Sequence, residues 1–266
     1  MIHLHYLQDG AVALVTLERP PANAFTPEGL LHHLQQTIER LNHEPRVRAL
    51  VITGNGPKFF SAGAYLNTFA DGIREVASTA ATRFGAALEA LHNARMIVIA
   101  TNNGYAMGGG LECALACDIR ITETHALMAL PETAVGLLPC GCGTQTLPWL
   151  VGEGWAKRMI LTGERIDAPT ALRIGLVEEV VETGAARKAA LKMAGRVVTL
   201  SPQAVTFSKV LVSCRPTRSG VTRLKVSTLS VRVGKMHSAC PFNCYRRMSA
   251  PYQKYLTMPR SFRHVS

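Results

Sequence analysis

Residues 103–121 read NGYAMGGGLECALACDIRI and join a glycine-rich turn to a helix and then to a strand. An apolar strand candidate at 96–100 precedes them, and the helical run 111–117 leads into a second strand candidate at 118–122. A helix between two short apolar strands is the basic unit of α/β folds with crossover connections. We therefore expect an α/β architecture.

The rest of the chain up to residue 200 repeats this alternation. Further β-branched runs at 11–17, 49–53 and 176–181 predict strands. Thr26 is expected to cap a helix that begins at Pro27 and ends near Asn42. A second helix is expected over 76–91. Its predicted inward residues are Ala80, Phe84, Ala87, Leu88 and Leu91. Other helices are expected at 109–117, 144–150, 153–161, 168–174, 184–198 and 202–212.

Two small-residue loops are candidates for ligand binding. Residues 58–64, KFFSAGA, follow a strand, and the glycines at 108–110 open a helix whose first N–H groups lack partners within the helix. Two such donors converging from separate loops would form an oxyanion hole. Ordinary glycine turns that pack helices against strands would produce the same spacing, so both interpretations stay open.

Two carboxylates lie near these loops in the sequence. Glu112 is just inside the helix that follows the glycines, and Glu132 follows Pro131 between apolar residues. Most carboxylates are solvated surface groups, but the apolar context favours partial burial of Glu132. Two carboxyl groups beside an oxyanion hole can share one water molecule and exchange protons with it. Two carboxyl groups and an oxyanion hole are the groups that an enzyme needs to add water across a polarised double bond.

Composition and motifs exclude several classes. The 266 residues are 47% hydrophobic, which is enough for a sizeable core. The sequence contains no phosphate loop, dinucleotide fingerprint, serine elbow or HExxH pair, and no cysteine pairs at zinc-finger spacing, so we expect no metal site. An odd number of cysteines, seven, favours reduced thiols. No apolar stretch reaches membrane length and no secretory signal is recognisable, so we expect a cytoplasmic protein without membrane insertion.

Three long motifs carry a family resemblance. SAGAYL (61–66), NGYAMGGGLECALACDIRI (103–121) and ALPETAVGLLPCGCGTQTLPWLVG (129–152) closely resemble the enoyl-CoA hydratase/isomerase family, also called the crotonase family. The similarity runs from about Val12 to Lys209 and includes 154–181. It implies a crotonase-like α/β spiral of ββα repeats, followed by a C-terminal helical region. It also implies an acyl-CoA thioester substrate and a homotrimer or a dimer of trimers.

The resemblance also implies roles for individual residues. The oxyanion donors fall on the backbone N–H groups of Ala64 and Gly109. Glu112 and Glu132 match the two catalytic glutamates of the hydratases, with Glu132 expected to protonate the α-carbon and Glu112 to activate water, although a shared proton describes the pair equally well. The expected substrate-binding residues are Ala22, Asn23, Ala24, Ala62, Tyr65, Leu66, Asn67 and Gly108. No cofactor is implied, because coenzyme A is part of the substrate.

The sequence departs from the family at three positions near the site. Tyr65 stands where an Asp is usual, Cys142 replaces a glycine, and Asn102 replaces an apolar residue. Cys142 would strain its turn if φ were positive there, and a buried Asn102 would need partners. None of these changes removes a catalytic group, so we predict an enoyl-CoA hydratase of fatty acid metabolism. A Δ3-Δ2 enoyl-CoA isomerase is the alternative within the family.

The C-terminal segment departs more strongly. We divide the chain into a spiral core at 1–200 and a C-terminal helical region at 201–266, which is atypical and basic beyond about 210. All 18 acidic residues precede residue 201, whereas 12 of the 29 Lys and Arg follow residue 200. The family's acidic closing helices are missing, which suggests a frameshift near codon 210. A weakly active or inactive protein that binds polyanions through this tail is the alternative of another class; otherwise nucleic acid is not an expected partner.

Overall fold

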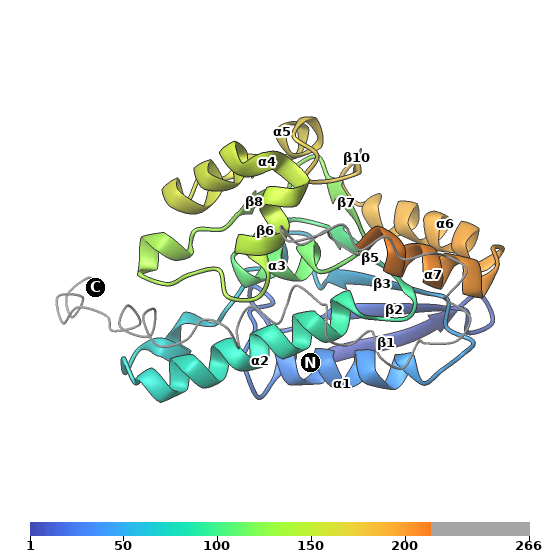
Figure 1. Cartoon of the computed structure of the whole chain (residues 1–266), viewed down its shortest axis with the longest axis horizontal. Helices are drawn as coiled ribbons and strands as arrows, with labels where there is room; N and C mark the ends of the chain where they lie inside the picture. Colours follow the sequence, from blue (N-terminus) through green and yellow to red (C-terminus); the bar gives the residue numbers. More distant parts are fainter. Residues whose placement is uncertain (214–266) are drawn as a thin grey trace.

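A six-stranded sheet forms the larger of two sheets in the computed structural model, which describes residues 1–213 (Figure 1). Its order is β1-β2-β3-β5-β7-β10. The outer strand β1 pairs with β2 antiparallel, and the other neighbours are parallel. The strands are β1 (Ile2–Leu7), β2 (Val12–Leu17), β3 (Ala49–Gly54), β5 (Ile97–Asn102), β7 (Ile119–Glu123) and β10 (Glu179–Val181).

The smaller sheet shows how the chain spirals. It contains β4 (Phe59–Ser61), β6 (Tyr105–Met107), β8 (Leu127–Ala129) and β9 (Ile166–Asp167), in the order β4-β6-β8-β9. The pairs β3/β4, β5/β6 and β7/β8 each give one strand to each sheet. The helices that follow these pairs are α2 (Arg74–His92), α3 (Gly109–Leu115) and α4 (Gly143–Thr162). These successive ββα turns confirm the predicted α/β spiral.

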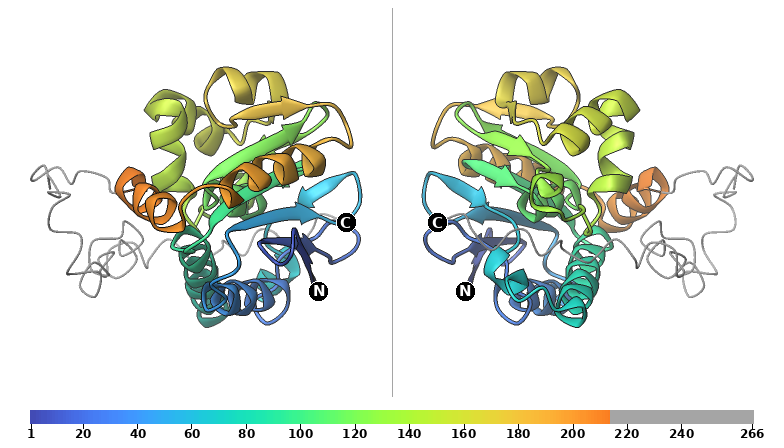
Figure 2. Two further views of the ribbon diagram at one scale, coloured as in Figure 1. Left: turned by 90° about the vertical axis from the view of Figure 1, so that its right-hand side faces the viewer. Right: turned by 90° about the vertical axis from the view of Figure 1, so that its left-hand side faces the viewer.

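The two faces of the large sheet pack against different layers. Along β2, Val15 and Leu17 belong to the main core, whereas Val12 and Leu14 belong to a smaller second core, because successive strand residues point to opposite faces. Helix α6 (Ala186–Val198) covers the second core with alanines at 186, 190 and 194, and it crosses that face of the sheet in Figure 2.

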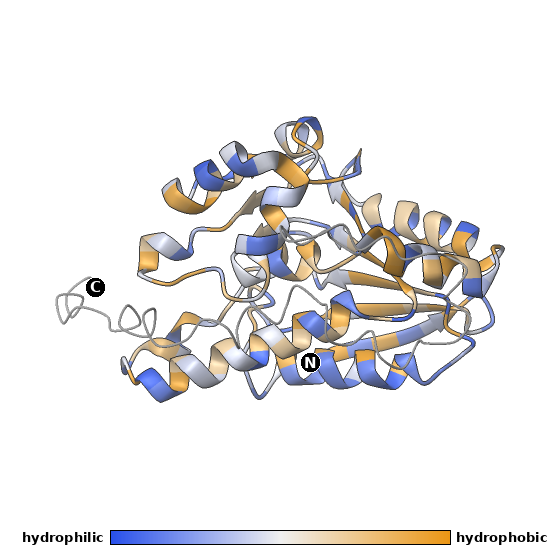
Figure 3. Ribbon diagram, in the orientation of Figure 1, coloured by the Kyte–Doolittle hydropathy of each residue, from blue (hydrophilic) through white to orange (hydrophobic). Residues whose placement is uncertain are grey.

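Helices α1 (Leu30–Asn42) and α2 cover the other side of the molecule (Figure 1). The inward residues predicted for α2 are its buried residues, so that prediction is confirmed. Polar and apolar residues alternate along α1 in Figure 3, as expected of a helix with one buried face. The predicted start of α1 is wrong: the N-cap is Gly29, because residues 27–29 form a turn in which Gly29 N–H donates to the Thr26 carbonyl.

The remaining elements follow the predicted pattern closely. Helix α4 breaks at Gly152, where φ is 78° and ψ is 160°, so its two parts match the two helices predicted there. In α7 (Pro202–Ser213), the Lys209 ammonium contacts the Asp118 carboxylate at 2.8 Å. The other short elements are the 3-10 helices η1 (Leu66–Phe69) and η2 (Glu132–Val135), and the helices α5 (Ala168–Arg173) and α7 (Pro202–Ser213).

The tail beyond Ser213, with the frameshift and polyanion predictions attached to it, lies outside the described residues. Within residues 1–213, none of the helices has the length and hydropathy needed to cross a bilayer.

Candidate active site

The two glycine-rich loops approach each other at backbone distance. Gly63 has φ +84°, and a Cβ placed on it would lie 2.9 Å from Gly109 N. A Cβ placed on Gly109 would lie 3.6 Å from Ala64 N and 2.6 Å from Phe84 Cε1. Only glycines permit this contact, because any side chain at either position would separate the loops.

The N–H groups of Ala64 and Gly109 are available to a ligand. Residues around Phe25 form a parallel bridge with Ala64, in which Phe25 N–H donates to Gly63 O at 2.7 Å and Tyr65 N–H donates to Phe25 O at 2.8 Å. This bridge uses the groups on either side of the Ala64 N–H. Within residues 1–213, neither Ala64 N–H nor Gly109 N–H donates to a protein acceptor. The structure therefore brings together two unpaired donors from separate loops.

Glu112 is a buried carboxyl group held by backbone donors. It lies on α3 and is 1% exposed. Its Oε1 accepts N–H groups from Gly141, Cys142 and Gly143 at 2.9, 2.9 and 2.8 Å. Burial raises the pKa of Glu112, whereas these hydrogen bonds lower it. Successive N–H groups converging on one oxygen make a small anion site, which fixes the orientation of this carboxyl group.

Glu132 is the partner carboxyl group. It begins η2, and its Oε2 is buried without a hydrogen-bond partner among the described residues. Burial, followed by the nearby charge of Glu112, raises the pKa of Glu132 to about 8. Gly108, at φ +51°, packs against this side chain, because a Cβ on Gly108 would lie 2.9 Å from Glu132 Oε1. Glu132 thus lies beside the glycine that precedes Gly109.

These four groups can act on one small ligand. The unpaired N–H groups suit an oxygen that gains negative charge, and the two carboxyl groups can hold a water molecule or move a proton beside it. A carboxyl group with a pKa near 8 is largely protonated at neutral pH, so Glu132 can donate a proton.

The loop at residues 22–24 is hydrogen-bonded to residues 61 and 62, just before the Ala64 donor. Ala62 N–H donates to Ala22 O at 2.9 Å, and the Ser61 hydroxyl donates to Asn23 O at 2.8 Å. The Asn23 side chain donates to Asn55 O and Phe59 O at 3.0 Å each, so its amide group binds the segment 55–60. Ala24 is buried. Contacts of Ala22, Asn23 and Ala24 with substrate stay a prediction.

The other predicted binding residues lie on the rim. Ala62 is half-buried, whereas Tyr65, Leu66 and Asn67 are exposed where η1 begins. Asn67 Nδ2 donates to the Tyr65 hydroxyl at 2.9 Å. Tyr65 through Asn67 therefore continue directly from the Ala64 donor.

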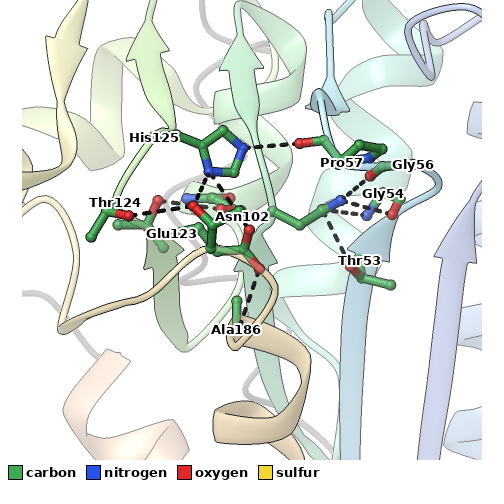
Figure 4. Close-up of polar contacts among 12 residues, drawn as sticks. Thr53, Gly54, Gly56, Pro57, Asn102, Glu123, Thr124, His125 and Ala186 are labelled. Atoms are coloured by element: carbon green, nitrogen blue, oxygen red, sulfur yellow. Dashed lines mark hydrogen bonds and ion pairs between the residues drawn. The ribbon is translucent and has the colours of Figure 1, made fainter.

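Polar side chains fix the turn that precedes the 58–64 loop. His125 Nε2 donates to Pro57 O at 2.9 Å, and Glu123 Oε1 accepts the Ala186 N–H at 3.3 Å (Figure 4). Asn103 Nδ2 donates to Gly56 O at 2.6 Å. The His125 and Asn103 contacts tie the segment after β3 to residues that follow β7 and β5, so the loop that carries Ala64 starts from a fixed point, whereas the Glu123 contact joins β7 to α6.

The sequence departures at 142 and 102 have different outcomes. Cys142 has φ −163°, so the positive φ that would strain a cysteine in this turn is absent. Asn102 is fully buried, its Oδ1 has no partner among residues 1–213, and its Nδ2 is 3.8 Å from Met128 Sδ. Asn102 therefore carries a desolvation cost without full compensation.

Several contributors to the site have no clear signal in the sequence. The Phe84 ring packs against Gly109, yet the apolar spacing of its helix predicts only that Phe84 is buried. The backbone cradle at 141–143 lies about thirty residues beyond Glu112. The half-buried Cys140 lies close to both carboxyl groups, whose charges add to burial in raising the pKa of its thiol. These residues are far apart in the sequence, so only the folded structure shows that they are neighbours.

Comparisons with known proteins agree with this geometry. The profile of the family described as enoyl-CoA hydratase/isomerase matches residues 8–229. A short-chain-enoyl-CoA hydratase from Clostridium acetobutylicum is 37% identical over 210 residues, 77% of this chain and 79% of the relative. The structure of Pseudomonas aeruginosa DspI is 59% identical, with a TM-score of 0.77, over 80% of this chain and 86% of that one. An enoyl-CoA hydratase structure from Bacillus anthracis is 37% identical, with a TM-score of 0.77, over 80% and 82%. The chain thus belongs to the enoyl-CoA hydratase/isomerase family.

Proposed function

We propose that the protein is an enoyl-CoA hydratase, which adds water across the 2,3 double bond of a 2-enoyl-CoA thioester to give a 3-hydroxyacyl-CoA. One observation carries the proposal: the Glu132 carboxyl group packs against Gly108, next to the unpaired N–H groups of Gly109 and Ala64, and the buried Glu112 lies on the helix that Gly109 begins. Hydration needs both an electron sink at the thioester oxygen and proton exchange at the double bond. Membership of the family supports an acyl-CoA substrate.

In the proposed reaction, the thioester oxygen accepts hydrogen bonds from Ala64 N–H and Gly109 N–H. Water attacks the β-carbon, the C=C electron pair moves toward the carbonyl, and the oxygen gains negative charge. Each backbone donor is expected to stabilise this charge by about 3–4 kcal/mol, as in other oxyanion holes. The water loses one proton, and the α-carbon gains one, so the reaction is balanced.

The environments of the carboxyl groups suggest their roles. Burial raises the pKa of Glu112, which makes its carboxylate a stronger base, and the three N–H groups that it accepts hold that carboxylate in place, so it suits the base that takes the proton from water. Glu132 has a pKa of about 8 and suits the acid that protonates the α-carbon. The two carboxyl groups are electrostatically coupled, so the apparent pKa values of the site belong to the pair rather than to single residues.

A spectroscopic assay tests the proposal. Loss of the enoyl absorbance of crotonyl-CoA and longer 2-enoyl thioesters measures hydration directly. We expect Glu132→Gln and Glu112→Gln each to lower kcat by at least about 10²-fold, the range of one acid or base. Glu39→Gln is the control, because Glu39 is exposed on α1 and, among residues 1–213, bonds only Gln35. Full activity of Glu132→Gln, or no turnover of any thioester by the wild type, would contradict the proposal.

Product analysis separates hydration from isomerisation. The alternative is a Δ3-Δ2 enoyl-CoA isomerase, since the same carboxyl group can exchange a proton with the α-carbon in either reaction: hydration adds a proton there, whereas isomerisation of a 3-enoyl thioester removes one and places a proton on the γ-carbon. Wild-type enzyme incubated with a 3-enoyl-CoA in H₂¹⁸O would give a 2-enoyl product without label if it is only an isomerase. A labelled 3-hydroxyacyl product from a 2-enoyl-CoA is the outcome expected here.

Two further parts of the proposal concern partners. We propose a homotrimer or a dimer of trimers, which light scattering of the purified protein measures directly. A polyanion-binding protein without enzymatic activity is the competing class: salt-sensitive retention of RNA without turnover of enoyl thioesters would favour it.

A further inference from the structure

The turn at residues 54–57 leads from β3 to β4, and side chains from distant parts of the chain bind its backbone. Each of its four carbonyl groups accepts a hydrogen bond from a side-chain N–H. The contacts are Asn103 Nδ2 to Gly54 O at 3.0 Å and Gly56 O at 2.6 Å, Asn23 Nδ2 to Asn55 O at 3.0 Å, and His125 Nε2 to Pro57 O at 2.9 Å. Residues 55–57 are exposed, where water could bind these carbonyls instead, so the direct contacts fix the path of the turn.

Asn103 makes the most of these contacts. It directly follows β5, the neighbour of β3 in the large sheet, so it lies beside the turn. Its Oδ1 accepts the Gly54 N–H at 2.9 Å and the Thr53 hydroxyl at 3.2 Å, in addition to the two bonds that Nδ2 donates. Both the donors and the acceptor of the amide group are therefore used. An Asp of the same shape would lose the donors and place a carboxylate against two carbonyl oxygens.

His125 binds the end of the turn, and its contacts define the state of its ring (Figure 4). A carbonyl oxygen only accepts, so Nε2 carries a proton whether the ring is neutral or charged. On the other side of the ring, Nδ1 lies 3.1 Å from the Thr183 hydroxyl and 3.7 Å from Glu123 Oε2. A nucleophile–histidine–acid set needs its nucleophile and its acid on different ring nitrogens. Thr183 and Glu123 share one nitrogen, so they orient the ring rather than form such a set.

The turn sets the position of β4, which leads directly to the Ala64 donor. Strand β4 has only three residues, and its pairing with β6 shifts register between Phe59 and Ser61. A Cβ placed on Gly54 would lie 2.3 Å from Phe59 O, so the turn and the strand are in backbone contact. A strand this short and irregular takes its position from its neighbours as well as from its own pairing. Moving the turn is therefore expected to move the segment that ends at Ala64.

We propose that Asn103 and His125 are positioning residues for the oxyanion hole: by binding the 54–57 turn, they fix the Ala64 N–H opposite the Gly109 N–H. The inference rests on the proposed hydratase function. An oxyanion hole is effective because its donors are in place before charge develops, and a displacement of about 1 Å can cost a factor of about 10² in rate. The contact strengthens as the oxygen gains charge, so its loss lowers kcat more than it changes KM.

Steady-state kinetics with crotonyl-CoA test this assignment. We expect Asn103→Asp to lower kcat by about 10²-fold and His125→Leu, which removes one exposed hydrogen bond, by about fivefold, with KM within about twofold of wild type. His125→Gln offers an N–H at a similar distance from the backbone and should restore most of kcat. His5→Leu removes an exposed histidine of the outer strand β1 and should change neither constant. Unchanged kcat in His125→Leu, or a loss that Gln does not restore, would overturn the assignment.

Hydrogen exchange separates this inference from the proposed reaction. Mass spectrometry of peptides that cover residues 57–65 measures opening of the loop without turnover. We expect faster exchange there in His125→Leu and Asn103→Asp, and wild-type exchange in His125→Gln and His5→Leu. If the wild type turned over no thioester, the hydratase proposal would fail, and faster exchange would still support the contact between these side chains and the loop. Unchanged exchange in both variants overturns the inference, as does faster exchange in an active enzyme whose kcat is unchanged.

Discussion

Replacing Glu132 by Gln is expected to stabilise the protein at alkaline pH while lowering its activity by the roughly 10²-fold or more given above. Gln keeps the shape of the protonated side chain but cannot ionise. In the wild type, burial and the Glu112 charge raise the pKa of Glu132 to about 8 from the ordinary value of 4.5. The folded state therefore holds a proton on Glu132 more tightly than the unfolded state does, and ionisation above pH 4.5 increasingly favours unfolding.

The size of this effect follows from the two pKa values. Below pH 4.5, both states bind the proton and the contribution to stability is complete; it is lost as the pH rises through 8. Each tenfold difference in proton affinity corresponds to about 1.4 kcal/mol, so Glu132→Gln should exceed the wild type in unfolding free energy by about 3 kcal/mol at pH 7. Above pH 8, the difference approaches at most about 5 kcal/mol, and at pH 4 it is near zero.

Urea unfolding followed by far-ultraviolet circular dichroism at pH 4, 7 and 9 measures these differences at one protein concentration. Glu39→Gln, with its exposed carboxylate, controls for the removal of a charge as such and should show no comparable pH dependence. A difference between Glu132→Gln and wild type that does not grow with pH, or a variant that is less stable at pH 9, would show that Glu132 is not the buried, high-pKa acid described above.

Three other predictions concern neighbouring groups. Gly108→Ala should lower kcat by roughly 10²-fold, because its φ of +51° disfavours alanine and the new Cβ would press on the Glu132 carboxyl group; unchanged steady-state kinetics would contradict this. Asn102→Leu should raise the unfolding free energy by about 1–3 kcal/mol, since it removes a buried amide with an unpaired oxygen; urea denaturation showing a loss would refute the reasoning. In a pH profile of wild-type kcat/KM, activity should fall above about pH 8 as Glu132 loses the proton that it donates, and a flat profile up to pH 10 would exclude Glu132 as the acid.

Long periodic elements could be predicted from the sequence, and short ones could not. The buried face of α2 follows its apolar spacing residue by residue, because one stripe of this helix packs on the core. The strands β4, β6, β8 and β9 have only two or three residues each, too few to show alternation. Strand β1 was also missed, since its IHLHYL sequence is only partly buried at the edge of the sheet.

For the site, motif residues were accessible to sequence reasoning, and their environment was not. The motifs place Glu112 and Glu132 near glycine loops in the sequence. In the structure the Glu132 carboxyl group packs against Gly108, whereas the Glu112 carboxyl group is bound by the backbone of 141–143. No local pattern predicts that the N–H groups of 141–143 converge on Glu112, or that Arg19 lies against Tyr65. These contacts join residues that are tens of positions apart, so they depend on the spiral as a whole.

The backbone cradle around Glu112 has a consequence for how such a site diversifies. Residues 133–140 start at one acid and return to the cradle of the other, so both ends of this segment are tied to the reacting groups. Exposed Val135 and Leu138 lie between these ties. Insertions or exchanges within the segment can therefore reshape the surface between the two carboxyl groups while the backbone donors that hold Glu112 are retained.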